Sequence, residues 1–392
     1  MKNPLQLIKT ILLIGLCLVA NPYLFSQPVI SWQNCFGGSS GEGAKHIIKT
    51  SDGGFLIVGT TYSNDGDVTG MHFWFNAIDS TWIASGDYWV LKIDSNYNIQ
   101  WQKCLGGSSS DYGMGAIETV GGYMIIGASA SNDGDITFSH GDSDYWLVKL
   151  DYSGTIIGQH SYGGSNTDAG YGIESTPDAG FILTGYTQSN DGDVTGYHGS
   201  VDIWIVKIDS VGNLIWQRSL GGSYVDYNAT SKVDALGNVY VAGLAISIDG
   251  DVTGSHGGGD AWLVKLDQNG NILWQKCFGG TGGDQFNNLD IKGAKLVMTG
   301  WTTSVDGDLS TNYGVHDAWV VLTDTSGNIV FSQNYGGSLI DEMFAVKFTS
   351  HNKIIACGYS YSNDVQVTMN HTPKDCWLIC VDSIGNLIWQ NS

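Results

Sequence analysis

The feature that most constrains this chain is an internal repeat of 57 or 58 residues. One copy, residues 180–222, reads GFILTGYTQSNDGDVTGYHGSVDIWIVKIDSVGNLIWQRSLGG. Its Asp-x-Trp pair occurs six times, as Asp87/Trp89, Asp144/Trp146, Asp202/Trp204, Asp260/Trp262, Asp317/Trp319 and Asp375/Trp377. A Gly-Gly pair followed by Ser or Thr also occurs six times, beginning at Gly37, Gly106, Gly163, Gly221, Gly279 and Gly336. Self-similarity at a fixed period indicates a repeat architecture, which overrides the two or three domains that 392 residues would suggest.

Each repeat contains four segments with the pattern of β-strands. In the first repeat they are residues 44–50, 54–62, 88–94 and 99–105. An Asp-Gly turn separates the first two, and such turns between apolar runs are typical of β-hairpins. The third segment is almost continuously apolar, which is typical of a strand buried on both faces. The repeat therefore predicts four antiparallel strands, and the mature chain shows no convincing helical period.

Four antiparallel strands repeated six times predict an all-β fold, a six-bladed β-propeller of four-stranded antiparallel blades. Blades bury both faces against their neighbours, and 11 of the 14 Trp residues fall on two repeat positions suited to that burial. A fourth-strand sequence stands both before the first repeat, at residues 30–36, and after the last, at residues 387–390. Either the N-terminal copy joins the final sheet and closes the ring, or it is left over. A seven-bladed ring is the less favoured alternative, because another chain would have to supply its missing strands.

Residues 1–26 have the features of a secretory signal peptide. Lys2 and Lys9 precede an apolar segment, residues 11–20, that is too short to span a bilayer, and Ser26 is suited to cleavage. We therefore expect a secreted or outer-surface protein without a transmembrane segment. Residues 27–392 are expected to form a single propeller domain, with repeats at 32–100, 101–157, 158–215, 216–273, 274–330 and 331–392.

The acidic composition limits the partners. The formal net charge is −21, so nucleic acid is excluded as a partner and anionic membranes are poor ones. Cations or a basic protein surface are the electrostatically favourable partners. We expect a monomer that binds a protein or a glycan.

The repeated motifs resemble a known family. The runs GGS-x-x-D, G-[FY]-[ILV]-x-x-G and D-x-W-[LIV]-V-K-[IL]-D-x-x-G-N-[IL]-x-W are similar to the bacterial β-propeller repeats known as SBBP, in particular the glycine-rich secreted copies of Bacteroidetes. The resemblance covers residues 32–390. It implies the propeller fold and little about activity, because that family is largely uncharacterised. A weaker resemblance to quinoprotein propellers comes without recognisable cofactor ligands.

The loop between the second and third strands carries paired carboxylates in five repeats. They are Asp65/Asp67, Asp133/Asp135, Asp191/Asp193, Asp249/Asp251 and Asp306/Asp308. Alternate carboxylates can present oxygen ligands to Ca²⁺, but the distal Glu of a twelve-residue calcium loop does not follow. The same aspartates can instead cap turns by accepting backbone N–H groups. We predict turn capping and no cofactor, with Ca²⁺ at these loops as the alternative.

An acidic residue follows each Gly-Gly pair and precedes the innermost strand: Glu42, Asp111, Asp168, Asp226, Asp284 and Asp341. Six such carboxylates near one axis would form a negative funnel at the channel mouth and could bind a ligand; six local turn caps are the alternative. An enzyme at this funnel, a polysaccharide lyase or hydrolase, is the second functional hypothesis. Because no Ser-His-Asp set or unique carboxylate pair breaks the repeat, the main prediction is a binding or adhesion module rather than an enzyme.

A His precedes the Asp-x-Trp motif in most repeats, at His72, His140, His198, His256 and His371. Equivalent positions of different blades lie far apart, so a shared metal site is disfavoured. We predict instead a hydrogen-bonded His–Asp–Trp set within each blade.

The first repeat departs from the others by an insertion of about twelve residues at 73–85. It contains the aromatic residues Phe73, Trp74, Phe75 and Trp82. Exposed aromatic side chains on a loop are typical of a contact surface, so we predict that they bind the partner. The alternative is that the insertion covers a blade.

Six cysteines follow the predicted signal peptide. Cys35, Cys104 and Cys277 occupy one repeat position, and the other three, Cys357, Cys376 and Cys380, all lie in the last repeat. Their spacing matches no zinc motif. Buried thiols are expected, with one disulfide in the last repeat as the alternative.

Overall fold

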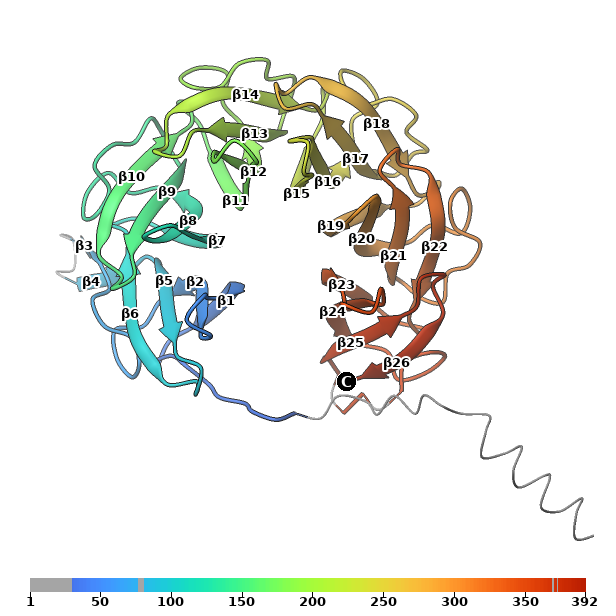
Figure 1. The fold of residues 1–392 in the computed structure, drawn as a ribbon, viewed down its shortest axis with the longest axis horizontal. Coiled ribbons are helices and arrows are strands. Elements are labelled where there is room, and N and C mark those ends of the chain that lie inside the picture. The colour runs from blue at the N-terminus through green and yellow to red at the C-terminus, as the bar shows by residue number, and fades with distance from the viewer. Residues whose placement is uncertain (1–29, 77–80, 369, 372) are drawn as a thin grey trace, which may run out of the picture.

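The computed structural model describes residues 30–76, 81–368, 370–371 and 373–392, and the predicted signal peptide lies outside them. The described chain forms six four-stranded antiparallel sheets and one two-stranded hairpin. The six sheets are arranged as blades around a common axis (Figure 1), which confirms the predicted all-β, six-bladed propeller. Within the described residues, no helix has the length and apolar character that would be needed to cross a bilayer.

The first strand of every blade lies innermost and the fourth outermost. Blades one and two contain β1 (Glu42–Lys49), β2 (Phe55–Thr61), β5 (Asp87–Ile93), β6 (Ile99–Leu105), and β7 (Asp111–Thr119), β8 (Gly122–Ser129), β9 (Asp144–Asp151), β10 (Ile156–Tyr162). Blades three and four contain β11 (Asp168–Ser175), β12 (Phe181–Thr187), β13 (Asp202–Ile208), β14 (Leu214–Leu220), and β15 (Asp226–Val233), β16 (Val239–Ala245), β17 (Asp260–Leu266), β18 (Ile272–Phe278). Blades five and six contain β19 (Asp284–Lys292), β20 (Lys295–Thr302), β21 (Asp317–Asp324), β22 (Ile329–Tyr335), and β23 (Asp341–Phe348), β24 (Ile354–Ser360), β25 (Asp375–Val381), β26 (Leu387–Asn391). The insertion forms the hairpin β3 (Phe73–Asn76) and β4 (Thr81–Ala84).

The two ends of each blade differ. One end, here called the turn face, carries the short turns between strands one and two and between strands three and four. In blade three, the Asp209 carboxylate accepts the backbone N–H groups of Val211 (2.9 Å) and Asn213 (2.8 Å), which closes the second of these turns. The opposite end, the loop face, carries the Gly-Gly loops and the longer Asp-Gly-Asp loops. Long loops on a rigid scaffold are where binding sites usually lie.

The core lies between the blades and is built around the Asp-x-Trp residue of each third strand. Trp204 of β13 is fully buried, and its ring packs against Tyr145 of blade two with centroids 4.7 Å apart. The Tyr145 hydroxyl donates a hydrogen bond to the Trp204 carbonyl (2.9 Å). Five apolar clusters of this kind each join two neighbouring blades. Each blade is therefore stabilised by its neighbours.

The second Trp position ties the outermost strand of one blade to the next blade. The Trp216 indole N–H of β14 donates to the Gln268 carbonyl (3.1 Å) in the turn of blade four. A Cβ on Gly270 in that turn would lie 2.9 Å from the Trp216 ring, and Gly270 has φ +82°. Glycine is required there both for the backbone conformation and for the close approach of the ring.

The ring is open between blade one and blade six (Figure 1). The fourth strand of blade six is β26, which pairs with β25 of the same blade. Residues 30–36 are not in a strand, so the N-terminal copy does not join the final sheet. Within the described residues, no strand of blade one pairs with a strand of blade six.

The interblade position of Trp204 leads to a stability prediction. The variant Trp204→Ala should lower the free energy of unfolding by about 3–5 kcal/mol, because it removes a buried indole and leaves a cavity. Urea unfolding followed by circular dichroism measures this change. The control Val120→Ala lies in a turn where the side chain is 98% exposed, and it should have little effect. An unchanged midpoint for Trp204→Ala would show that this residue does not hold the core together.

Candidate functional site

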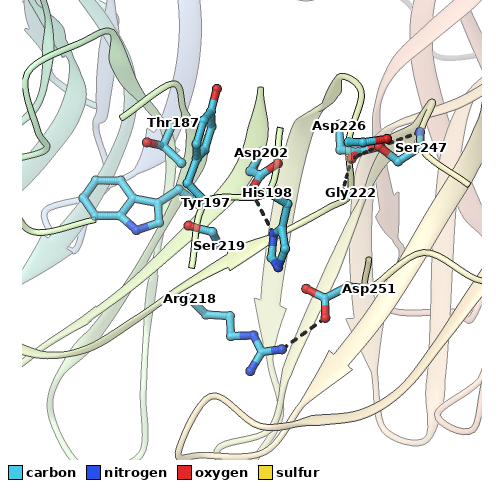
Figure 2. A network of polar contacts seen from close by, with 12 residues as sticks. Thr187, Tyr197, His198, Asp202, Arg218, Ser219, Gly222, Asp226, Ser247 and Asp251 are labelled. Carbon is cyan, nitrogen blue, oxygen red and sulfur yellow. Dashed lines mark hydrogen bonds and ion pairs between the residues drawn. The ribbon is translucent and has the colours of Figure 1, made fainter. Parts of the chain in front are cut away.

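The acidic residue that starts each innermost strand is a buried cap of the Gly-Gly loop. In blade four the Asp226 carboxylate accepts the Gly222 N–H (2.8 Å) and the Ser247 hydroxyl (2.6 Å), as Figure 2 shows. Asp111, Asp168, Asp284 and Asp341 accept the corresponding Gly N–H in their own blades. All five aspartates are 0% exposed. Glu42 is partly exposed and accepts the Gly38 N–H at 3.2 Å.

This geometry corrects the expectation of an acidic funnel at the channel mouth. The five aspartates point into the loops of their own blades, as the turn-cap alternative describes. The enzymatic hypothesis relied on these carboxylates being accessible, and their burial gives it no support. Ligand binding at these six residues is otherwise untested.

The central channel is lined by the innermost strands of all six blades and has a volume of about 600 Å³. Its charged groups include the lysines Lys45, Lys232 and Lys347. Lys232 forms an ion pair with Glu174 of blade three, and Lys347 pairs with Asp290 of blade five at 2.9 Å. These ion pairs join neighbouring blades. The channel therefore carries mixed charge, in contrast to the loop face described next.

The Asp-Gly-Asp loops hold the Gly-Gly loops of the same blade. In blade three, Asp191 accepts the Ser165 N–H (2.7 Å) and Asp193 accepts the Gly163 N–H (3.4 Å). In the other blades the first aspartate of the loop accepts the equivalent Ser or Thr N–H: Asp65, Asp133, Asp249, Asp306 and Asp364. Asp67, Asp135 and Asp308 accept the Gly N–H, whereas the Asp251 carboxylate binds Arg218 (Figure 2).

The sixth blade keeps half of this arrangement. Its loop reads Asp364-Val365-Gln366, and its lack of a second carboxylate set it apart in the sequence. In the structure, Asp364 accepts the Ser338 N–H (2.8 Å) and the Gln366 side-chain oxygen accepts the Gly336 N–H (3.2 Å). The sequence could have identified Asp364 as the equivalent of the first aspartate in the other loops. Gln366 stands two residues later, and its side-chain oxygen can accept a hydrogen bond as the second aspartate does.

The first aspartate of each loop is exposed to solvent in all six blades. Hydrogen bonds from the facing Ser or Thr hold the pKa of each of these carboxyl groups below its usual value. The six carboxylates therefore remain ionised at neutral pH. We call them the loop-face aspartates: Asp65, Asp133, Asp191, Asp249, Asp306 and Asp364.

The described residues contain no group of three or more His, Cys, Asp or Glu side chains arranged to hold a metal ion. The loop-face aspartates direct one oxygen to a backbone N–H group, which is the turn-capping role. Calcium binding at the Asp-Gly-Asp loops stays a prediction. The six cysteines of the described chain are free thiols. The expectation of buried thiols is confirmed for Cys104 and Cys380 and wrong for Cys35 and Cys376, which are exposed.

The predicted His–Asp contact is present, but the Trp is not part of it. The His198 N–H donates to Asp202 (2.7 Å), and its Nδ1 lies 3.0 Å from the same carboxylate (Figure 2). His72, His140, His256 and His371 lie beside the equivalent aspartates at 2.8–3.6 Å. The Trp204 indole N–H instead donates to the Gln217 side chain at 2.7 Å.

The Gln partner of each buried Trp was missed from the sequence. It is Gln102, Gln159, Gln217, Gln275 and Gln390, with Ser332 in blade five. The Gln lies 13 residues after the Trp, on the neighbouring strand. The recurring Trp-Gln dipeptide of the fourth strand was the available signal.

The insertion forms a hairpin at the outer edge of the ring (Figure 1). Its register pairs Phe73 with Ala84. Phe73 is partly buried and packs against the apolar cluster of blade one. The side chains of Trp74, Phe75 and Trp82 lie outside the described residues, so their role in binding stays a prediction.

Buried carboxylates of the loop face give the fold a pH dependence. Burial raises the pKa of Asp111, Asp202 and Asp317 to about 6. Between this value and the unfolded value near 3.8, the native state binds more protons than the unfolded state. The contribution of these three groups to the free energy of unfolding therefore rises as the pH falls from 7 to about 5. His46 contributes in the opposite direction, because burial lowers its pKa to about 4. The pKa values of Asp52 and Asp178, which bind Lys92 and Lys207, are held at about 2, and their contribution is lost at lower pH.

We expect Asp202→Asn to flatten this rise between pH 7 and pH 5, because the amide cannot ionise yet can still accept the His198 N–H. Urea unfolding at pH 5, 6 and 7 measures the effect. The control Asp209→Asn changes an exposed turn aspartate whose pKa is lowered by its hydrogen bonds with Asn213, and should leave the slope unchanged. Equal slopes for Asp202→Asn and the unmodified protein would contradict this assignment.

Comparison with known proteins identifies no family for this chain. No family model matches the chain. A segment of 193 residues is 24% identical to the regulatory protein FlaEY of Caulobacter vibrioides, covering 45% of this chain and only 20% of that protein. The solved structures include a Bacteroides caccae protein of unknown function (12% identity, TM-score 0.41, 76% of this chain and 83% of that one) and the WD40 domain of Neurospora crassa Pan2 (10%, 0.44, 80% and 86%). The likeness to SBBP repeats therefore stays a resemblance, and function must be argued from the geometry.

Proposed function

We propose that this protein is a binding module, secreted or held at the outer cell surface, whose loop face binds a basic surface of another protein. The observation that carries the proposal is the set of six loop-face aspartates. Each blade contributes one, and each is exposed, ionised and fixed by a hydrogen bond from the Gly-Gly loop.

Fixed charge favours recognition. Backbone N–H groups already hold these carboxylates in place. The aspartate side chains therefore lose little conformational entropy when a partner binds them. The net charge of −21 extends the attraction beyond contact distance and increases the rate of encounter with a cationic partner. Within the described residues, none of the six loop-face aspartates forms an ion pair. The ion pairs of these loops are made by the second aspartates: Asp251 with Arg218 (3.2 Å), Asp193 with His140 (3.6 Å) and Asp135 with His72 (3.9 Å).

A protein partner fits this surface better than a glycan does. Carboxylates can accept hydrogen bonds from sugar hydroxyls, but a neutral sugar carries no charge for the ring to attract and an acidic sugar is repelled. Lysines and arginines of a protein form charge-assisted hydrogen bonds with carboxylates. Glycan binding remains an outcome that the experiments below can reveal. The secretion and monomer predictions from the sequence are part of the proposal and are equally open to test.

The test neutralises loop-face charge without removing the hydrogen bonds. The fourfold variant Asp133→Asn, Asp191→Asn, Asp249→Asn and Asp306→Asn keeps an acceptor oxygen at each position. Binding of a fluorescent oligolysine peptide should weaken by about tenfold, and its dependence on salt should become shallower, because fewer counter-charges are engaged. Fluorescence anisotropy at two salt concentrations gives both quantities.

The matched control is the fourfold variant Asp94→Asn, Asp151→Asn, Asp209→Asn and Asp267→Asn. These aspartates cap turns on the opposite face and accept comparable backbone hydrogen bonds. The control changes the net charge equally and should retain most of the affinity. Equal losses in both variants would mean that total charge, and not the loop face, determines binding.

The hairpin of blade one provides a second prediction. Replacing residues 74–84 by a short Gly-Ser connection should leave the melting temperature almost unchanged, because Phe73 and the blade core are retained. The same deletion should abolish binding on a printed protein and glycan array, if the aromatic residues of the insertion supply contact area. Unfolding of blade one on deletion would identify the hairpin as a structural cover.

A further inference from the structure

Residues 30–36 lie beside blade one as an outermost strand lies beside the blade that follows it. The Trp32 ring stacks on Tyr97, with centroids 4.3 Å apart and an interplanar angle of 17°. Trp32 shares its repeat position with Trp101, whose indole N–H donates to the Tyr152 carbonyl in the equivalent turn of blade two (3.0 Å). Both rings therefore cover the turn between strands three and four of the following blade.

The end of this segment also contacts blade one as the end of an outermost strand contacts the blade that follows it. Phe36 packs against the apolar cluster of blade one, as Leu105 of β6 packs in the cluster shared with blade two. The Gly37 N–H donates to Asp67 (3.1 Å), as the Gly106 N–H does to Asp135 (3.2 Å). Residues 30–37 thus approach blade one in the manner of the fourth strand of a preceding blade.

The three inner strands of that preceding blade are missing from the described chain. Blade six cannot supply them, because its third strand β25 is already paired with its own fourth strand β26. Residues 30–36 therefore have no third strand to pair with, which explains why they do not form a strand despite their sequence. Cys35 is exposed, whereas Cys104 at the same position of β6 is buried.

Blade one and blade six each expose, at the opening between them, a surface that is buried in the other blades. Ile47 of β1 is 59% exposed, but its equivalents are at most 6% exposed: Ala116, Ile173, Ser231, Leu289 and Val346. Cys376 of β25 is exposed, and its equivalents are at most 1% exposed: Tyr88, Tyr145, Ile203, Ala261 and Ala318. In each of those blades the covering group is a neighbouring blade.

We propose that the position between blade six and blade one accepts a three-stranded antiparallel unit of this same repeat, which residues 30–36 complete as the fourth strand of a seventh blade. The unit comes from outside residues 30–392, and the ring opens at this place in Figure 1. The five existing interfaces indicate what this unit must be like. It is apolar on both faces, and its third strand carries an Asp-x-Trp motif. The indole of that motif covers Cys376 as Trp204 covers Tyr145. The inference goes beyond the proposed function and does not depend on it.

The test supplies the unit to the full chain. A copy of residues 220–267, which contains a Gly-Gly loop and three strands of blade four, is fused after Ser392. It contains no cysteine, so maleimide labelling of the native protein reports on the original thiols alone. Labelling of Cys376 and Cys35 should slow by about tenfold or more relative to the unfused chain, because a buried thiol reacts only after local opening. The melting temperature should rise.

The control fusion carries Trp32→Ala and Phe36→Ala, which remove the anchors of the fourth strand, and it should lose the protection. If the first fusion does not fold, a fusion carrying residues 105–151 of blade two, also free of cysteine, replaces it. Undiminished labelling of Cys376 in a folded fusion overturns the proposal. So does an unfused chain that is dimeric and already protected at Cys376, since the occupant would then be a second copy.

Discussion

The structure depends on the burial of one indole ring between each pair of neighbouring sheets. A sheet made from these repeats is apolar on both faces, so it cannot be stable in water alone. Trp204 shows the solution: it belongs to blade three, packs on Tyr145 of blade two, and is completely buried by the two together. The same requirement holds at the five interfaces between neighbouring blades, which is why the units pack side by side around an axis.

Much of this fold could be predicted because local signals repeat. Turn aspartates, Gly-Gly pairs and the apolar third strand each recur in six copies, and each copy reduces the ambiguity of the others. The direction of the Asp226 side chain could not be predicted. Its place before the innermost strand suggested the channel, whereas hydrogen bonds from Gly222 and Ser247 turn it into the loop. The partner of Trp204 was missed for a related reason, since Gln217 comes near only through strand pairing.

The candidate site shows how a structural role can produce a functional surface. Asp191 is present because the Ser165 N–H needs an acceptor, and a carboxylate is the strongest acceptor at this position. One oxygen satisfies the loop, and the charge that remains faces solvent. The electrostatic character of the loop face is therefore a consequence of loop geometry, and the sequence pattern alone showed the residues without showing which oxygen was engaged.

The contact between an outermost Trp and the following blade affects the order in which the interblade contacts form during synthesis. Trp216 precedes its hydrogen-bond partner Gln268 by 52 residues. During synthesis from the N-terminus, at about 5–20 residues per second, the indole leaves the ribosome about 3–10 s before the turn that covers it. The outer edge of blade three is therefore incomplete until the turn of blade four has been synthesised. Trp101 of blade one precedes its partner Tyr152 by 51 residues, so it has a similar delay. A translational pause inside the blade that follows such a Trp leaves the preceding blade exposed for longer.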